Sequence, residues 1–192
     1  ITVEELMHYV KGPDFPTGGI IQGRQGIKDA FETGRGRIVV RSKTDIEVSD
    51  SGRETIVVTE IPYMVNKREM IEKIAELVES KKIEGIAYIN DETTMKGVRI
   101  VIRLKKDANA NVVLNMLYKY SPLQSSFSVN NVALVNGRPR TLNLKDLIKY
   151  FVRHRHDVIV RRTRFDLEKA QKRAHVLEGL LKALDVIDQI IN

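Results

Sequence analysis

The sequence of 192 residues contains neither cysteine nor tryptophan, and only 6% of its residues are aromatic. The absence of cysteine excludes a disulfide framework, a thiolate nucleophile and a zinc site built on cysteine. The scarcity of aromatic side chains disfavours single-stranded nucleic acid, which proteins bind largely by stacking bases on such rings. No apolar run approaches the roughly 18 residues of a membrane span, and no signal-peptide pattern opens the chain. These features predict a cytoplasmic protein. Because the chain begins at Ile1 and ends without a glycine cap, we interpret it as a piece of a longer one.

Positive charge is concentrated near the C-terminus. Between Arg140 and Arg173 there are eleven lysines or arginines but only four acids, a surplus of seven. The whole chain, with 32 basic and 25 acidic residues, also carries a surplus of seven, so the remainder sums to zero. A basic element of this kind is typical of proteins that bind a polyanion, although a solvated basic helix face is the plainer interpretation.

The same region has the pattern of one long helix. Residues 143–192 contain no proline, and the only glycine is Gly179. A first set of apolar residues keeps helical spacing: Leu144, Leu147, Ile148, Phe151, Val158, Ile159 and Phe165. A second set is spaced as the seam of a coiled coil: Leu177, Leu180, Leu184, Ile187 and Ile191. A helix of about 48 residues spans roughly 70 Å, so we expect it to project from the body or to be broken once.

The preceding residues, 1–142, predict an α+β domain with a mixed or antiparallel sheet and packed helices. Helices are expected to begin at a Thr2–Glu5 capping box, near residue 24, behind Asn66 and at residue 109. Strands are expected at 20–21, 38–48, 54–59, 83–90, 98–104 and 126–135, and Asn136-Gly137 predicts a tight hairpin turn. We therefore predict two domains, 1–142 and 143–192.

Two groups of basic residues are the candidate binding site. The first group consists of Arg24, Lys28, Arg35, Arg37, Arg41 and Lys43. Arg37 leads into the predicted strand over residues 38–48. If this strand is continuous, alternation places Arg37, Arg41 and Lys43 on one face. They would form a row of phosphate contacts to duplex DNA or a solvated sheet face. The second group lies on the long helix and consists of Arg153, Arg155, Arg161, Arg162 and Arg164.

Motifs for catalysis or metal binding are weak. The glycines of residues 18–26 lack the Gly-Lys-Ser/Thr of a phosphate loop and are better explained as turn residues. His154 and His156 are two residues apart and therefore point to different sides of a helix, which disfavours a metal site. Asp91 and Glu92 have no neighbouring nucleophile. The residues indicate no catalytic and no metal site.

Several short segments of the sequence resemble segments of the A subunits of bacterial DNA gyrase. They are GPDFPTGG at 12–19, ETGRG at 32–36, VTEIP at 58–62, VNK at 65–67, IEKIAELV at 71–78, KDANA at 106–110, ALVNGRP at 133–139, RRTR at 161–164 and RAHVLEG at 173–179. The resemblance runs nearly from end to end. The A subunit of topoisomerase IV is the close relative, and the forms at 15–19 and 109–111 are more similar to gyrase.

The resemblance implies the tower domain and the start of the coiled-coil arm that leads to the exit gate. The parent enzyme of this family is a type II topoisomerase that depends on ATP and Mg²⁺. In it, a tyrosine preceded by arginine cleaves DNA. None of the tyrosines here follows an arginine, so the resemblance implies no catalytic residue and no cofactor in this segment. The implied partners are double-stranded DNA, a gyrase B subunit, plus a second A subunit, in the bacterial cytoplasm at the nucleoid. Two hypotheses follow: a non-catalytic segment that supports DNA, or a structural segment for subunit contact without DNA contact.

Overall fold

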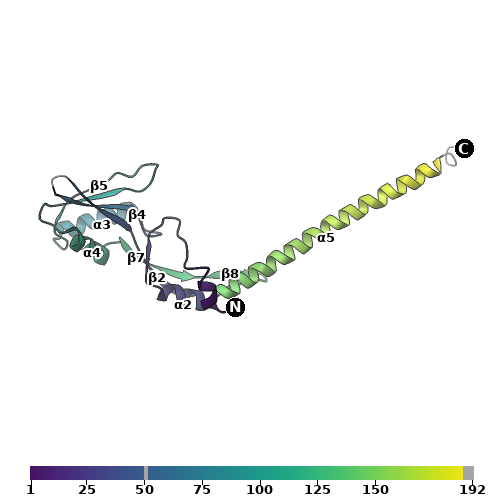
Figure 1. Cartoon of the computed structure of the whole chain (residues 1–192), viewed down its shortest axis with the longest axis horizontal. Helices are drawn as coiled ribbons and strands as arrows, with labels where there is room; N and C mark the ends of the chain where they lie inside the picture. The colour runs from purple at the N-terminus through teal and green to yellow at the C-terminus, as the bar shows by residue number, and fades with distance from the viewer. Residues whose placement is uncertain (50–51, 188–192) are drawn as a thin grey trace. The chain divides into compact units, whose positions relative to one another are not determined.

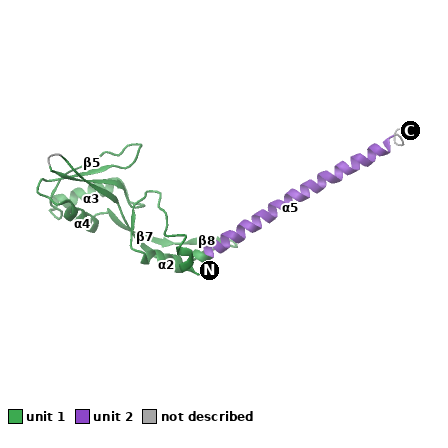
Figure 2. Cartoon of the chain, viewed as in Figure 1, with its two compact units in different colours: residues 1–145 green, residues 146–192 purple. Residues whose placement is uncertain are grey.

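The computed structural model describes residues 1–49 and 52–187. The chain divides into two compact units, residues 1–145 and 146–192 (Figure 2). The first unit contains all the strands and four helices of the described chain, and the second consists of the long helix. The predicted α+β class is thereby confirmed.

The first sheet of unit 1 is small and antiparallel, with strand order β1-β2-β7. Its strands are β1 (Ile20–Gln22), β2 (Arg35–Arg41) and β7 (Gln124–Asn130). One face packs on helix α2 (Gln25–Thr33), whose Ile27 and Phe31 are buried against Ile38 and Val40 of β2. The short helix α1 (Val3–Met7) precedes β1 and begins at the predicted capping box. Gly34 ends α2 in the left-handed conformation, with φ of 80°, as its position after the last apolar turn predicts.

The second sheet has strand order β3-β4-β6-β5 and is also antiparallel. It comprises β3 (Lys43–Val48), β4 (Glu54–Glu60), β5 (Ile86–Asp91) and β6 (Ile100–Leu104). Helices α3 (Lys67–Glu79) and α4 (Ala110–Tyr120) cover one face of it (Figure 1). Asn66 caps α3 through its side-chain oxygen, as predicted, and Asn109 caps α4 in the same way, one residue before the helix begins. The larger core lies between this sheet and its two helices.

The predicted continuous strand over residues 38–48 is wrong. β2 ends at Arg41, and β3 begins at Lys43 in the other sheet. The break falls at Ser42, which is fully buried and whose N–H donates to the carbonyl of Leu123 at 2.8 Å. Hydrophobic alternation continues across Ser42, so periodicity alone did not show the change of sheet.

The predicted strand over residues 126–135 is likewise divided, into β7 and β8 (Val132–Val135). Between them, the N–H of Asn131 donates to Gly34 while its carbonyl accepts from Leu142, so the chain changes partners at this residue. β8 then pairs with β9 (Arg138–Thr141), a strand that the sequence analysis did not predict. The predicted turn at Asn136-Gly137 is confirmed, because both residues have positive φ, 52° and 76°.

The long helix α5 runs without interruption over Leu144–Asp185, 42 residues. The alternative of one break is therefore not seen in the described residues. All five predicted arginines of α5 are exposed, and so are Leu177, Leu180, Leu184 and Ile187 of the predicted seam; Ile191 lies outside the described residues. Neither α5 nor any other helix in the described part of the chain is long and apolar enough to cross a membrane.

Candidate nucleic-acid interface

The face of the first sheet that points away from α2 carries three arginines and, among its described residues, no carboxylate. Alternation along β2 buries Ile38 and Val40 against α2 and turns the odd-numbered residues of the strand to this side. The register of the sheet then fixes which residues of β1 and β7 share that side. We call this set the arginine face: Ile20, Gln22, Arg35, Arg37, Val39, Arg41, Gln124, Ser126, Ser128 and Asn130.

The arginine face combines positive charge with neutral hydrogen-bonding groups. In the ladder, Arg35 lies opposite Asn130, and Arg37 lies opposite Ser128. Both arginines are exposed, and neither side chain has a hydrogen-bond or ion-pair partner among the residues described. Guanidinium groups flanked by hydroxyl and amide side chains are the usual donors to DNA phosphates. This face can therefore accept an anion without first breaking an internal ion pair.

Arg41 is held differently from the other two arginines. Its Nε donates to Oε1 of Gln124 at 2.6 Å, and its guanidinium lies 4.7 Å from the centre of the Tyr118 ring. Tyr118 in turn lies 2.8 Å from Oγ1 of Thr44, with its hydroxyl against the carbonyl of Ser42. Arg41 is half-buried. Because it contacts Gln124 of β7 and Tyr118 of α4, it links β2 to both elements.

Lys43 lies beyond the break, in the second sheet, and its amino group is 3.4 Å from Oε1 of Glu60. Glu60 also accepts a 2.6 Å hydrogen bond from the N–H of Gly19. This bond is the main reason that the pKa of Glu60 lies below its ordinary value; burial opposes the shift, and the charge of Lys43 adds to it. The predicted row of Arg37, Arg41 and Lys43 thus does not lie on one sheet face, because its third member belongs to another sheet and has an acidic partner.

Arg24 and Lys28 lie at α2, on the opposite side of the first sheet from the arginine face. Lys28 pairs with Glu4 at 3.3 Å and with Glu32 at 3.7 Å, and the hydrogen bond to Glu4 is the main reason that its pKa is raised. Arg24 immediately precedes α2 and makes no side-chain capping bond. The structure therefore brings Arg35, Arg37 and Arg41 together and separates them from the rest of the first predicted group.

The five arginines of α5 surround the helix. At about 100° per residue, Arg153, Arg161 and Arg164 fall on one side, whereas Arg155 and Arg162 fall on the other. Arg161 donates to the backbone carbonyl of Asp157 at 3.3 Å. The helix therefore offers positive charge in several directions rather than along one stripe.

β7 and Gln22 contribute to the arginine face, although neither was predicted from the sequence as part of the site. Gln124, Ser126, Ser128 and Asn130 alternate with Phe127 and Val129, which is the signal that could have placed them on one face. Their proximity to the arginines depends on the pairing of β7 with β2, which are separated by more than 80 residues of chain.

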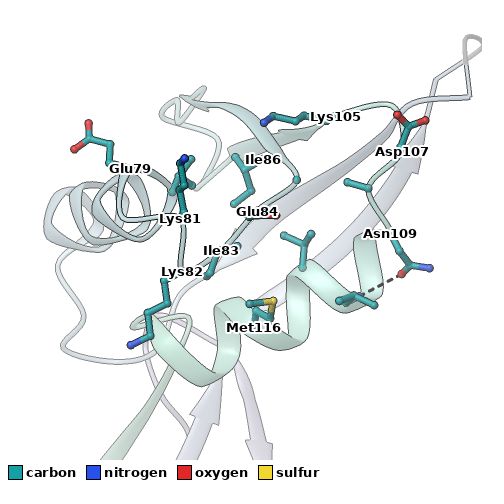
Figure 3. Close-up of a pocket in the computed structure, with 15 residues that line it drawn as sticks. Glu79, Lys81, Lys82, Ile83, Glu84, Ile86, Lys105, Asp107, Asn109 and Met116 are labelled. Atoms are coloured by element: carbon teal, nitrogen blue, oxygen red, sulfur yellow. Dashed lines mark hydrogen bonds between the residues drawn. The ribbon is translucent and has the colours of Figure 1, made fainter.

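A cavity of about 910 Å³ lies away from the predicted residues, between the end of α3, residues 81–86 and the start of α4 (Figure 3). Its lining is apolar at Ile83, Ile86 and Met116, with Lys105 and Asp107 at its rim. The first N–H groups of α4 are already satisfied, because Asn109 and Glu54 accept hydrogen bonds from them. Within residues 1–49 and 52–187 no cluster of three or more histidine, aspartate or glutamate side chains could hold a metal ion.

Fold and surface together define an α+β segment with a basic, carboxylate-free sheet face, followed by a long basic helix. Comparison with known proteins identifies the family: the model for the A subunit of DNA gyrase/topoisomerase IV matches residues 1–192. The chain belongs to this family, and the resemblance noted in its sequence is confirmed.

The relatives found by comparison are DNA gyrase A subunits. The chain is 55% identical over 191 residues to the DNA gyrase A subunit of Clostridium acetobutylicum and covers 23% of that protein. It is 57% identical over 192 residues to the corresponding protein of Staphylococcus epidermidis and covers 22% of it. The protein of Staphylococcus aureus strain MRSA252 is also 57% identical, over 193 residues, and is covered to 22%. All of the present chain is aligned in each case, so it spans less than a quarter of the length of these relatives.

Proposed function

We propose that this chain is a DNA-supporting, non-catalytic segment of the breakage-reunion subunit of a gyrase-type, ATP-dependent type II topoisomerase. In this proposal residues 1–142 are the tower-like domain that holds the flanks of the cleaved duplex through phosphate contacts. Residues 143–192 begin the coiled-coil arm toward the exit gate. The observation that carries the proposal is the arginine face, where the guanidinium groups of Arg35 and Arg37 have no partner among the described residues.

The remaining assignments of the parent enzyme follow from family membership and stand as parts of the same proposal. Its partners are double-stranded DNA, a gyrase B subunit, plus a second A subunit, in an A₂B₂ complex of the bacterial cytoplasm at the nucleoid. ATP and Mg²⁺ act through other regions of that complex. The reaction it serves is negative supercoiling of DNA.

Equilibrium binding to duplex DNA tests the proposal. We expect Arg35→Glu/Arg37→Glu to weaken binding to all sequences alike, by about tenfold or more at low salt, because phosphate contacts carry no sequence information. The slope of log affinity against log salt between about 50 and 200 mM should fall by about two, one for each lost phosphate contact. Fluorescence anisotropy with two unrelated labelled duplexes measures both quantities.

The matched control is Lys105→Glu/Lys106→Glu, which makes the same change of net charge at two exposed lysines that directly follow β6. If both double variants weaken binding equally, the effect is one of overall charge, and the arginine face has no special role. An affinity that is independent of salt contradicts the phosphate model altogether.

The apolar residues of α5 favour a second candidate function, a structural segment for subunit contact. Leu180 and Leu184 are 57% and 61% exposed, and with Leu177 they form a strip with the spacing of a helix–helix seam, which a partner would cover. Under this alternative the basic residues of the chain are solvated and DNA affinity is negligible even at low salt. The same titration therefore discriminates between the two functions.

A further inference from the structure

β7 is an edge strand of the first sheet. Within the described residues it pairs only with β2, in a register that runs regularly from Arg35 opposite Asn130 to Arg41 opposite Gln124. Just beyond the two ends of this register, Asn131 donates to Gly34 and Ser42 donates to Leu123, both at 2.8 Å. Hydrogen-bonded and non-hydrogen-bonded pairs alternate along an antiparallel ladder. These two bonds therefore fix which residues of β7 form main-chain hydrogen bonds with β2.

The odd-numbered residues of β7 direct their main-chain N–H and C=O groups toward β2. The even-numbered residues therefore direct theirs away from β2, toward the open edge of the sheet. Gln124 has a 3.5 Å contact from its N–H to the carbonyl of Ser121. The N–H groups of Ser126, Ser128 and Asn130 have no hydrogen-bond partner among the residues described, and all three residues are exposed. The free edge thus presents three main-chain donors at the two-residue spacing of a β-ladder.

The other edges of the two larger sheets carry features that discourage pairing. β1 has only three residues. β3 carries Lys43, Asp45 and Glu47 and is shifted in register after Lys43. β5 has a register shift between Ile86 and Tyr88.

β7, in contrast, has seven residues with no charge, no proline, no glycine and no bulge. An edge without such protection is a template for another strand. Among the edge strands of the described residues, β7 is therefore the one best suited to pair with another strand.

The side chains beside this edge define what would bind there. On the arginine face, Ser126, Ser128 and Asn130 offer donors, with Arg35 and Arg37 on the next strand, and this favours carboxylates. On the opposite face, Val129 packs on the small core, and Phe127 belongs to a ring cluster with Phe15 at 5.2 Å and Tyr63 at 5.6 Å. A strand laid along β7 would therefore place polar, acidic residues on one side and apolar residues on the other.

From this geometry we propose that β7 takes up an extended peptide segment, alternating acidic and apolar residues, as a fourth antiparallel strand of the sheet. The main-chain groups of Ser126, Ser128 and Asn130 supply the ladder, and the two faces supply the sequence preference. The ladder itself is independent of the proposed DNA contact, because it uses backbone hydrogen bonds, whereas the preference for acidic residues draws on Arg35 and Arg37.

The test uses the whole chain and a labelled peptide of about nine residues in which glutamate alternates with valine. One control peptide has the same composition with its glutamates and valines in separate blocks. A second control is N-methylated at every other residue, which removes the ladder hydrogen bonds but retains charge and side chains. We expect the alternating peptide to bind at least about tenfold more tightly than either control, and to slow hydrogen exchange at Ser126 and Ser128.

A pair of variants tests the same strand from the protein side. Ser128→Pro removes an outward N–H without removing a bond to β2, whereas Ser128→Ala keeps the N–H and loses only the hydroxyl. We expect affinity for the alternating peptide to fall by about tenfold or more in the proline variant and to stay within about threefold in the alanine variant. An amide NMR spectrum checks that the proline variant is folded; if it is not, the N-methylated peptide decides.

Equal binding of the block or N-methylated peptide would overturn the proposal, because charge alone would then explain the affinity. Unchanged exchange at Ser126 and Ser128 at saturating peptide would overturn it as well. Two other occupants give distinct contradicting results. A second copy of the chain would show self-association that Ser128→Pro abolishes, and duplex DNA would protect the same amides when the peptide does not.

Discussion

Gly18 and Gly19 hold the loop of residues 12–19 against the second sheet. Gly19 donates its N–H to Glu60 at 2.6 Å, and Gly18 has φ of 72° with the carboxylate of Glu60 occupying the space of an added Cβ. Phe15 from the same loop stacks on Tyr63 at 5.7 Å. The loop thereby joins the sheet that carries the arginine face to the larger one.

The substitution Gly18→Ala should therefore destabilise the fold more than Gly23→Ala. Gly23 has a similar φ of 79° but nothing within 4 Å, so alanine there meets only the backbone cost of about 1 kcal/mol. Alanine at Gly18 adds displacement of Glu60 and loss of its hydrogen bond, for a total of about 2–3 kcal/mol. Thermal unfolding measures the difference, which is expected to be about 2–8 °C. Equal melting temperatures for the two variants would show that Glu60 does not hold the loop.

The arginines illustrate what could be predicted from sequence at the residue scale. Alternation correctly placed Arg37 and Arg41 on the same face of a strand. It could not distinguish their roles, because Arg41 is engaged by Gln124, which lies 83 residues away in sequence. Whether a charged side chain is free for a ligand is decided by tertiary neighbours, and these are not encoded in its local pattern.

At the scale of elements, helices and turns were predicted well because their signals are local. The caps at Thr2 and Asn66 depend on residues within three positions of one another, and the turn at Asn136-Gly137 depends on two. The two strand breaks depend on bonds to distant residues, such as Ser42 to Leu123. For this reason the two-sheet arrangement, and with it half of the arginine face, could not be predicted from sequence.

The apolar residues of α5 lead to a prediction about association. Leu177, Leu180, Leu184 and Ile187 are all at least 43% exposed and have helical seam spacing. At about 25 cal/mol per Å² such a strip offers only a few kcal/mol, while association costs at least several. We expect a monomer at micromolar concentration with weak pairing above it.

Sedimentation over about a hundredfold range of concentration measures this pairing. Leu180→Ala/Leu184→Ala should remove it, whereas Val160→Ala, at an exposed position on another side of α5, should not. A stable dimer at the lowest concentration would contradict the estimate and would show that α5 contains a complete interface.

At the scale of the whole molecule, the positive charge lies on two compact units. Unit 1 carries the arginine face, and unit 2 carries the arginines that surround α5. The sequence alone favoured the region that contains α5, because the surplus between Arg140 and Arg173 equals that of the entire chain. The structure adds a second surface whose charge is not apparent from composition, because acids elsewhere in unit 1 cancel it in the sum.

NMR of the arginine Nε–Hε groups during titration with a duplex shows directly whether the arginine face supports DNA. We expect the signals of Arg35 and Arg37 to shift and to return when salt is raised. The signal of Arg99, which is already paired with Glu92 at 3.2 Å and Glu47 at 3.4 Å, should remain unchanged. Shifts confined to the arginines of α5, or no shift at saturating DNA, would contradict the claim.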